Sequence, residues 1–405
     1  MDRIILHCDC NCFYASCELL SRPELRNLPV AVCGEAAERH GIILAKNEPA
    51  KRCGVKTAET IYAAKKKCPD LVLLPPHHDL YAACSRRVNA IYGEYTDLVE
   101  PFGIDESWLD MTHSLHLFGG DAKAFADTLR ARIRRELGLT ISVGVSFNKV
   151  FAKLGSDYKK PDATTVIARE NWREIVFPLP VGDLLFVGRS AQELLGRYGV
   201  RTIGELAACS EEMLETLMGR TGSQLHRYAN GLDESPVRGD ADREPVKSVG
   251  NSTTFRRDLT RWDEIRSGIS LLSDSVATRL RRYGLYCGGV QVGIKNSRFQ
   301  VSSRQTMLPH STHLMREIND TALHLARELW KAPDPVRLLS VTALHLTEET
   351  QSFRQLDLLG TDEAQQEKQE AVESAMDALR QKYGRGVISY GAAEDAVGGE
   401  KSERE

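Results

Sequence analysis

The sequence predicts an α+β protein with a first domain built on a sheet with helices, a helical segment and a second α+β domain. Three observations support this class. Short apolar runs alternate with helix-like segments over residues 1–166, residues 167–235 read as mostly helical, and a polar Pro/Gly-containing stretch at 232–245 separates further strands and helices. At 405 residues the chain is also too long for one ordinary core, so we expect several domains.

The first domain begins with an apolar run at residues 3–8, typical of a buried strand, which Asp9 follows directly. We expect a sheet with helices on one face, because the later pattern alternates strands and helices. If the hairpin pairs with the first strand, Asp9 lies close to Asp105 and Glu106. The expected elements are a helix at 79–96, two strands around a Pro/Gly turn at 97–112, a helix at 119–138, a strand at 140–147 and a helix after Asn148 that ends before Pro161.

The helical segment contains a Gly turn at Gly188-Arg189. Backbone N–H groups at a helix N-terminus can hold a phosphate, so the turn is a candidate nucleic-acid contact. A plain helix–turn–helix packing unit would give the same pattern. The polar stretch at 232–245, nearly free of apolar residues, reads as a linker.

The second α+β domain combines strands with expected helices at 262–283 and 311–330. Residues 243–304 contain 12 Lys/Arg and 5 Asp/Glu, whereas residues 346–405 contain 7 Lys/Arg and 14 Asp/Glu. A basic domain before an acidic tail fits nucleic-acid binding, and an ordinary solvated surface fits equally well. The tail predicts one amphipathic helix at 364–383, with an apolar face made of Val372, Ala375, Met376, Leu379 and Tyr383.

The 10 cysteines indicate reduced thiols rather than a disulfide framework. Cys8, Cys10, Cys12 and Cys17 cluster at the start, but they lack the spacing of common zinc sites. We find no apolar run long enough to cross a membrane and no signal peptide, so we expect a cytoplasmic protein.

The stretch "FGIDESWLD" (102–110) places two adjacent carboxylates in an apolar hairpin. With Asp9 they form a set of hard oxygen ligands that suits magnesium and phosphoryl transfer. Neighbours on a regular strand point to opposite faces, so we expect a bend at Gly103-Ile104 that lets both acids serve one site. A solvated turn would explain the pair alone, although the apolar flanks favour a position against a core. Asp110 is expected to be structural.

Three stretches, "HCDCNCFYASCE", "FGIDESWLD" and "GVSFNKVFAKLGSDYKKPDATT", together resemble the Y-family DNA polymerases, the translesion group. The resemblance covers about residues 1–345. It implies template-directed DNA synthesis without proofreading, with a ferredoxin-like antiparallel palm sheet, small fingers, a helical thumb and a little finger. The implied ranges are palm 1–10 and 78–166, fingers 11–77, thumb 167–233, linker 234–245, little finger 246–346 and acidic tail 347–405.

By position, the resemblance implies that Asp9, Asp105 and Glu106 are the catalytic carboxylates that bind two Mg²⁺ ions, for which Mn²⁺ can substitute. Cys10 matches a residue that lends its backbone carbonyl to a metal. Tyr14 matches the aromatic steric gate that selects deoxyribonucleotides, although a core aromatic would look the same. Lys160 matches a lysine that contacts the incoming triphosphate.

One segment departs from the family pattern. "KNEPAKRCGV" has Glu48 and Lys51 where the family commonly carries a Tyr and an Arg that hold the triphosphate. We expect Lys51 to contact the nucleotide as a point charge, and we leave the role of Glu48 open. Lys149, Lys153 and Lys159 are expected on a helix surface. The candidate DNA-binding residues are Gly188, Arg189, Arg256, Arg257, Lys295 and Arg298.

The start of the acidic tail, "RQLDLLG", resembles the short peptide by which bacterial polymerases dock on the sliding clamp. The matching residues are Gln355, Leu356, Leu358 and Leu359. The expected partners are thus primer-template DNA, dNTPs and the clamp, with a monomeric chain and no membrane. Two other interpretations stay open. The chain could be a DNA- or clamp-binding scaffold that has the same fold but no catalytic activity, or a nucleotide cyclase, which the palm acids alone suggest.

Overall fold

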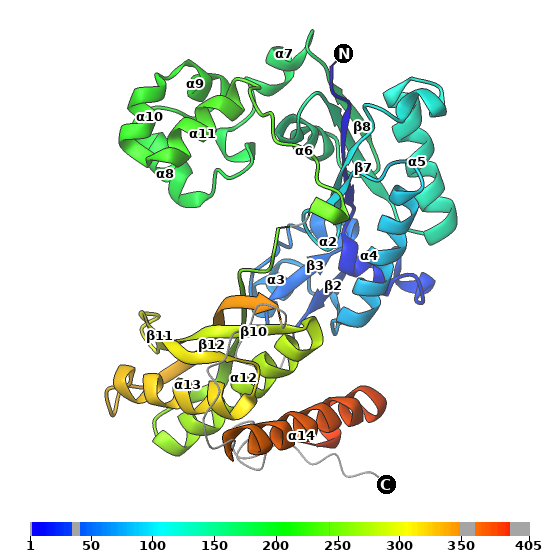
Figure 1. Ribbon diagram of the computed structural model, residues 1–405. Coiled ribbons are helices and arrows are strands. Elements are labelled where there is room, and N and C mark those ends of the chain that lie inside the picture. The colour runs from blue at the N-terminus through cyan, green and yellow to red at the C-terminus, as the bar shows by residue number, and fades with distance from the viewer. Residues whose placement is uncertain (1, 35–40, 243, 349–360, 389–405) are drawn as a thin grey trace. The chain divides into compact units, whose positions relative to one another are not determined.

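The computed structural model describes residues 2–34, 41–242, 244–348 and 361–388 and divides the chain into two compact units, Met1–Arg243 and Glu244–Glu405 (Figure 1). The clamp-like peptide at 355–359 lies outside the described residues. Within them, no helix is long and apolar enough to cross a membrane.

A five-stranded sheet of order β5-β6-β1-β7-β8 forms the centre of the first unit. β1 lies in the middle and runs antiparallel to both neighbours, whereas β7 and β8 are parallel. The predicted pairing of the hairpin with the first strand is therefore confirmed. The strands are β1 (Ile5–Cys10), β5 (Val99–Pro101), β6 (Glu106–Asp110), β7 (Ile141–Ser146) and β8 (Thr164–Ile167).

Helices cover both faces of this sheet, so the expectation of helices on one face only was wrong. α4 (His78–Gly93) and α5 (Ala122–Leu137) pack against alternate residues of β1 such as Leu6 and Cys8. α6 (Lys149–Tyr158) covers the opposite face, where Ala152 packs with Ile5 and Trp108. Because side chains of a strand alternate, His7 and Asp9 share the α6 side with Ile5.

Two glycines let α6 lie directly on the sheet. A Cβ on Gly144 of β7 would stand 1.9 Å from the carbonyl oxygen of Ala152, and one on Gly155 would stand 2.9 Å from the Cα of Gly144. Any larger residue at either position would push the helix away. This close contact brings the side chains of α6 next to the end of β1.

A smaller sheet of order β3-β2-β4 lies within residues 11–77 and packs with short helices around Ala31, Ile43 and Leu71. As predicted, α6 follows Asn148, whose side chain caps it, and α1 begins after Cys12, which has φ 51°. The elements are β2 (Val30–Cys33), β3 (Ile43–Lys46), β4 (Val72–Leu74), α1 (Phe13–Glu18), α2 (Glu48–Arg52) and α3 (Ile61–Lys67).

Residues 172–229 are helical, as predicted, and pack around a core that includes Leu195, Ile203 and Leu214. The chain then passes through the predicted linker, where Val237 is buried against Trp108 and Ile5. This part of the linker is therefore packed on the sheet domain, which its polar composition did not predict. The helices are α7 (Trp172–Val176), α8 (Arg189–Arg197), α9 (Ile203–Ala208), α10 (Glu211–Met218) and α11 (Arg220–Ala229).

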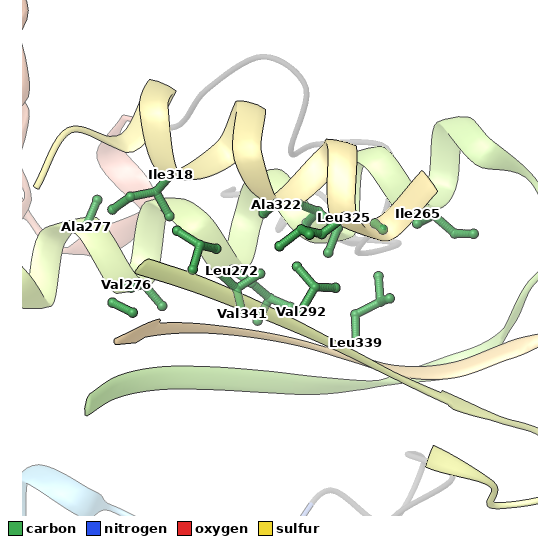
Figure 2. Packing of buried hydrophobic residues seen from close by; sticks show 14 of the residues in the cluster. Ile265, Leu272, Val276, Ala277, Val292, Ile318, Ala322, Leu325, Leu339 and Val341 are labelled. Atoms are coloured by element: carbon green, nitrogen blue, oxygen red, sulfur yellow. The ribbon is translucent and has the colours of Figure 1, made fainter. Parts of the chain in front are cut away.

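The second unit is an antiparallel sheet of order β11-β10-β12-β9 with two helices on one face. Figure 2 shows Val292, Leu339 and Val341 of the sheet beneath apolar residues of α12 and α13, which form its core. The elements are β9 (Ser248–Leu259), α12 (Trp262–Tyr283), β10 (Leu285–Asn296), β11 (Val301–Thr312), α13 (Met315–Leu329), β12 (Val336–Glu348) and α14 (Thr361–Tyr383).

The tail helix α14 forms as predicted, but its apolar face is not the face that packs. Met376 is buried, whereas Val372, Leu379 and Tyr383 are exposed. Charged residues make the contacts instead, because Arg281 of α12 pairs with Glu373 and Asp377.

Candidate functional site

The predicted acids meet on the α6 face of the five-stranded sheet. Asp9 at the end of β1 and Glu106 at the start of β6 are directly opposed in the antiparallel register. Opposed residues project to the same face of a sheet, so their carboxylates are neighbours. Asp105 precedes β6, and its carbonyl accepts from the N–H of Cys10 (2.9 Å).

A tight bend at residues 102–105 puts Asp105 beside Glu106. The N–H groups of Phe102 (3.0 Å) and Gly103 (3.3 Å) both donate to the carbonyl of Glu106. A Cβ on Gly103 would lie within 3.5 Å of both Asp105 Oδ1 and Glu106 Oε1. The predicted break in strict strand alternation is thereby confirmed.

Two lysines lie against these acids: Lys153 within α6, and Lys160, which follows the end of that helix. Lys153 Nζ lies 2.5 Å from Glu106 Oε2 and 3.4 Å from Asp9 Oδ2, and Lys160 Nζ lies 2.7 Å from the same Asp9 oxygen. Both ammonium groups also pair with Asp157. Lys160 was predicted at the site. Lys153 was predicted on the helix surface, and that was wrong.

Of the other two lysines predicted on the helix surface, one is buried, contrary to the prediction, and one is exposed. Lys149 is buried and pairs with both oxygens of Glu100 (2.8 and 2.7 Å), with its Nζ 4.4 Å from the Trp108 ring centroid. Lys159 is exposed, as predicted. The spacing of Lys153, Asp157 and Lys160 at i, i+4 and i+7 is a helical-face signal that could have found Lys153.

Burial and repulsion between like charges both act on the pKa values of Asp105 and Glu106. Burial, followed by repulsion from Asp9, raises the pKa of Asp105 above its usual value. Burial also raises the pKa of Glu106, although the bond from Lys153 opposes the shift. Burial disfavours the charges of Lys153 and Lys160, but the surrounding carboxylates outweigh it and raise both pKa values. The site thus concentrates negative charge that two lysines partly neutralise.

The donor chemistry of the site fits a hard divalent cation. The lysines contact Oδ2 of Asp9 and Oε2 of Glu106, whereas Oδ1 and Oε1 have no side-chain partner within the part of the chain that the structure describes. Within the described ranges, no group of three His, Cys, Asp or Glu side chains is close enough to hold a metal as it stands. Burial raises the pKa of the Cys10 thiol well above its usual range, so only its backbone carbonyl suits a hard cation.

Tyr14 lies on α1 and is half-buried. Its ring stacks on Tyr81 at 4.2 Å between centroids and meets His78 edge-on at 6.0 Å. On α2, Glu48 Oε1 lies 3.5 Å from both Lys51 Nζ and Cys12 Sγ. The two residues that depart from the family pattern therefore contact each other.

The candidate DNA-binding residues fall in both units. In the first, Gly188 is the N-cap of α8, and the exposed Arg189 pairs with Glu193 (2.8 Å). In the second, Arg256 and Arg298 are exposed, Lys295 is half-exposed on β10, and Arg257 is paired with Glu264 of α12 (2.5 Å).

Family comparison defines the class of this fold and site. Residues 8–157 match the model described as the impB/mucB/samB family, and residues 246–358 match the C-terminal domain of that family. A solved Y-family DNA polymerase chimera matches with a TM-score of 0.76 at 21% identity, covering 85% of this chain and 100% of that chain. The fold is therefore that of a Y-family polymerase.

Curated relatives match along nearly the whole chain. DNA polymerase IV of Acetivibrio thermocellus is 46% identical, covering 95% of this chain and 96% of the relative. DNA polymerase IV 1 of Bacillus subtilis is 39% identical, covering 96% and 93%. The chain belongs to the impB/mucB/samB family as a DNA polymerase IV-like member, which confirms the predicted class of translesion, DNA-directed DNA polymerase.

Proposed function

We propose that the chain extends a primer on DNA templates, including damaged ones, with Asp9, Asp105 and Glu106 as its metal-binding acids. One observation carries this assignment: three carboxylates, from β1, the 102–105 bend and the start of β6, lie near one another beside two lysines. Asp9, Asp105 and Glu106, with the carbonyl of Cys10, would hold two Mg²⁺ ions, or Mn²⁺ in their place. Such ions lower the pKa of the primer 3′-OH and neutralise charge on the leaving pyrophosphate.

The basic residues would handle the substrates. Lys160 can exchange its contact with Asp9 for a phosphate oxygen of the dNTP, since a compact ammonium binds either oxyanion. Lys51 is proposed as a second phosphate contact once it leaves Glu48. Gly188, Arg189, Arg256, Arg257, Lys295 and Arg298 are proposed to contact the phosphates of primer-template DNA, independently of base sequence.

Primer extension tests the assignment of the acids. The wild type is expected to extend a primer with dNTPs and Mg²⁺ or Mn²⁺ on undamaged and lesion-bearing templates. Asp105→Ala should abolish extension while DNA binding persists, because the charge that holds the metal is lost. Asp70→Ala, which alters an exposed acid of the same unit, is the control and should extend normally. Absence of extension by the wild type with either metal would refute the proposal.

Tyr14 is proposed as the steric gate that rejects a 2′-OH. Tyr14→Ala should raise ribonucleotide incorporation about tenfold or more, since one missing steric clash is worth more than ~1.4 kcal/mol in selectivity. The measurement is the ratio of kcat/KM for dNTP and rNTP. An unchanged ratio would remove Tyr14 from this role.

Gln355, Leu356, Leu358 and Leu359 are proposed to dock a monomeric chain on the sliding clamp, on the strength of the "QLDLL" sequence alone. Deleting 355–359 should reduce retention on immobilised clamp without affecting extension of a short primer. Equal retention of the deleted and full-length chains would refute this assignment.

A further inference from the structure

One carboxylate outside the proposed metal-binding set pairs with both lysines of the site. Asp157 lies in the last turn of α6, four residues after Lys153 and three before Lys160. Its Oδ2 lies 3.4 Å from Lys153 Nζ, and its Oδ1 lies 2.7 Å from Lys160 Nζ. Among the described residues, Asp157 is the one acid outside the metal-binding set that pairs with either lysine.

Each ammonium group is therefore shared between Asp157 and an acid of the site. Lys153 Nζ lies 2.5 Å from Glu106 Oε2. Lys160 Nζ lies 2.7 Å from Asp9 Oδ2, which is also its distance from Asp157. The lysine side chains are 17% and 26% exposed, whereas that of Asp157 is 49% exposed. Both ammonium groups thus have one acid on the buried side and another at the solvent boundary.

This sharing matters because an ammonium group and a divalent cation compete for the same carboxylate oxygens. Like charges repel, so the ammonium groups must give way wherever Asp9 and Glu106 hold a cation. A partly buried charge that leaves its partner is costly unless it meets another one. Asp157 offers such a partner within ion-pair distance, and its exposure keeps water around the pair.

We propose that Asp157 is a positioning residue that sets the affinity of the site for a divalent cation by holding the ammonium groups of Lys153 and Lys160. This inference rests on the metal-binding role proposed above. Without Asp157, the ammonium groups would have only Asp9 and Glu106 as acidic partners in the described part of the chain. They would then pair with these oxygens more firmly and oppose a cation more strongly.

Calorimetry with Mn²⁺ on the full chain, without DNA or nucleotide, tests this role. We expect Asp157→Asn to weaken Mn²⁺ affinity about fivefold, an ordinary coupling for contacting charges. Asp157→Glu restores the carboxylate and should recover the affinity to within about twofold. Unchanged affinity in Asp157→Asn would overturn the proposal.

Asp127 of α5 offers a matched control. It pairs with Lys123 four residues before it and with Arg130 three residues after it, both at 2.8 Å, which is the spacing found around Asp157. Its helix packs on the opposite face of the sheet from α6. Asp127→Asn should therefore leave Mn²⁺ affinity unchanged, and a loss equal to that in Asp157→Asn would overturn the proposal.

A double-mutant cycle separates the holding of the lysines from the attraction between Asp157 and the cation itself. With Lys153→Met and Lys160→Met in place, no ammonium group remains for Asp157 to hold. We expect Asp157→Asn to change Mn²⁺ affinity less than about twofold in this background. The full loss in this background would overturn the proposal, because Asp157 would then act by its charge alone. Melting curves confirm that each variant folds.

The outcome for the proposed function is measured separately. If the wild type extends no primer with either metal while Mn²⁺ affinity follows the variants as expected, the proposed function is wrong and the role of Asp157 stands. If the wild type extends primers and Asp157→Asn binds Mn²⁺ as tightly as the wild type, the role of Asp157 is wrong and the proposed function stands. Absence of Mn²⁺ binding by the wild type would overturn the role of Asp157.

Discussion

Two clusters of buried charge, one in each unit, differ in how completely their oxygens are paired. The site cluster consists of Asp9, Asp105, Glu106, Lys153 and Lys160. The tail cluster consists of Arg281 and Thr278 of α12 with Glu373 and Asp377 of α14. Both clusters take carboxylates out of water, which costs free energy unless partners compensate.

The tail cluster leaves no carboxylate oxygen without a donor. Both oxygens of Glu373 accept from the N–H of Met315 (3.0 and 3.1 Å), and one also pairs with Arg281. Asp377 accepts from Thr278 through Oδ1 (3.1 Å) and from Arg281 Nε through Oδ2 (2.7 Å). Such a closed network fastens a helix to its unit and has no capacity for a ligand.

The site cluster is open by comparison. Its lysines engage one oxygen each of Asp9 and Glu106, and Asp105 has no lysine within ion-pair distance in the described ranges. Three acids therefore share two ammonium groups, and both of these ammonium groups also pair with Asp157. Incomplete pairing is what distinguishes a site that can take up a cation from one that holds the fold together.

The comparison is tested most strongly by removing one charge from each cluster. Glu106→Gln should lower the rate of primer extension at least ~100-fold, the size of effect seen when one group that stabilises transition-state charge is lost. Glu373→Gln should leave the rate within about twofold. Single-turnover extension measures both. A large loss of rate with Glu373→Gln would show that the tail cluster is more than structural.

Loss of Arg281 should mainly affect stability. Arg281→Ala leaves the buried Glu373 without its counter-charge, and breaking a buried pair in this way costs about 3–5 kcal/mol. Hydrogen exchange of the full chain should show lost protection in α12 and α14 with unchanged protection in the five-stranded sheet. Arg316→Ala, an exposed residue with a loose 3.8 Å pair, is the control and should change little. Equal loss of protection in both units would contradict a local role.

The sequence predicts the site better than it predicts the surroundings of the site. The positions of the acids could be predicted because strand pairing and the apolar flanks of Asp105 limit where the carboxylates can lie. The bend at Gly103 could be predicted because both acids must reach one site. Lys153 was misplaced because an isolated lysine on a helix is usually solvated. Only the close contact of Gly144 with Gly155 turns that face of α6 toward β1.

The tail helix shows the opposite failure. Its spacing predicts an apolar face that includes Val372 and Leu379, yet both are exposed. Periodicity reports that a helix is amphipathic, but it cannot report that Arg281 on a distant helix will pair with Glu373. The burial of Val237 in the linker escaped prediction for a similar reason, since one valine in a polar stretch has no periodicity.

The smallest expected effect concerns the stability cost of the open cluster. The pKa of Asp105 is raised by burial and by Asp9, so its carboxylate is harder to ionise in the folded chain than in the unfolded chain. The ionised group therefore destabilises the fold at pH 7, and this penalty disappears as pH falls through the folded pKa. Asp105→Asn should raise the melting temperature at pH 7 by no more than a few degrees, about what 1 kcal/mol produces at this size.

The experiment requires chelator throughout, so that no divalent cation compensates Asp105 in the wild type. The gain should shrink as pH falls into the range where the wild-type carboxyl is protonated. Asp110→Asn is the matched control from the same stretch, because Asp110 accepts from the N–H of Thr112 (2.9 Å) and should lose stability instead. If Asp105→Asn lowers the melting temperature at pH 7 as Asp110→Asn does, Asp105 is a paired structural acid, and the contrast between the two clusters fails at that residue.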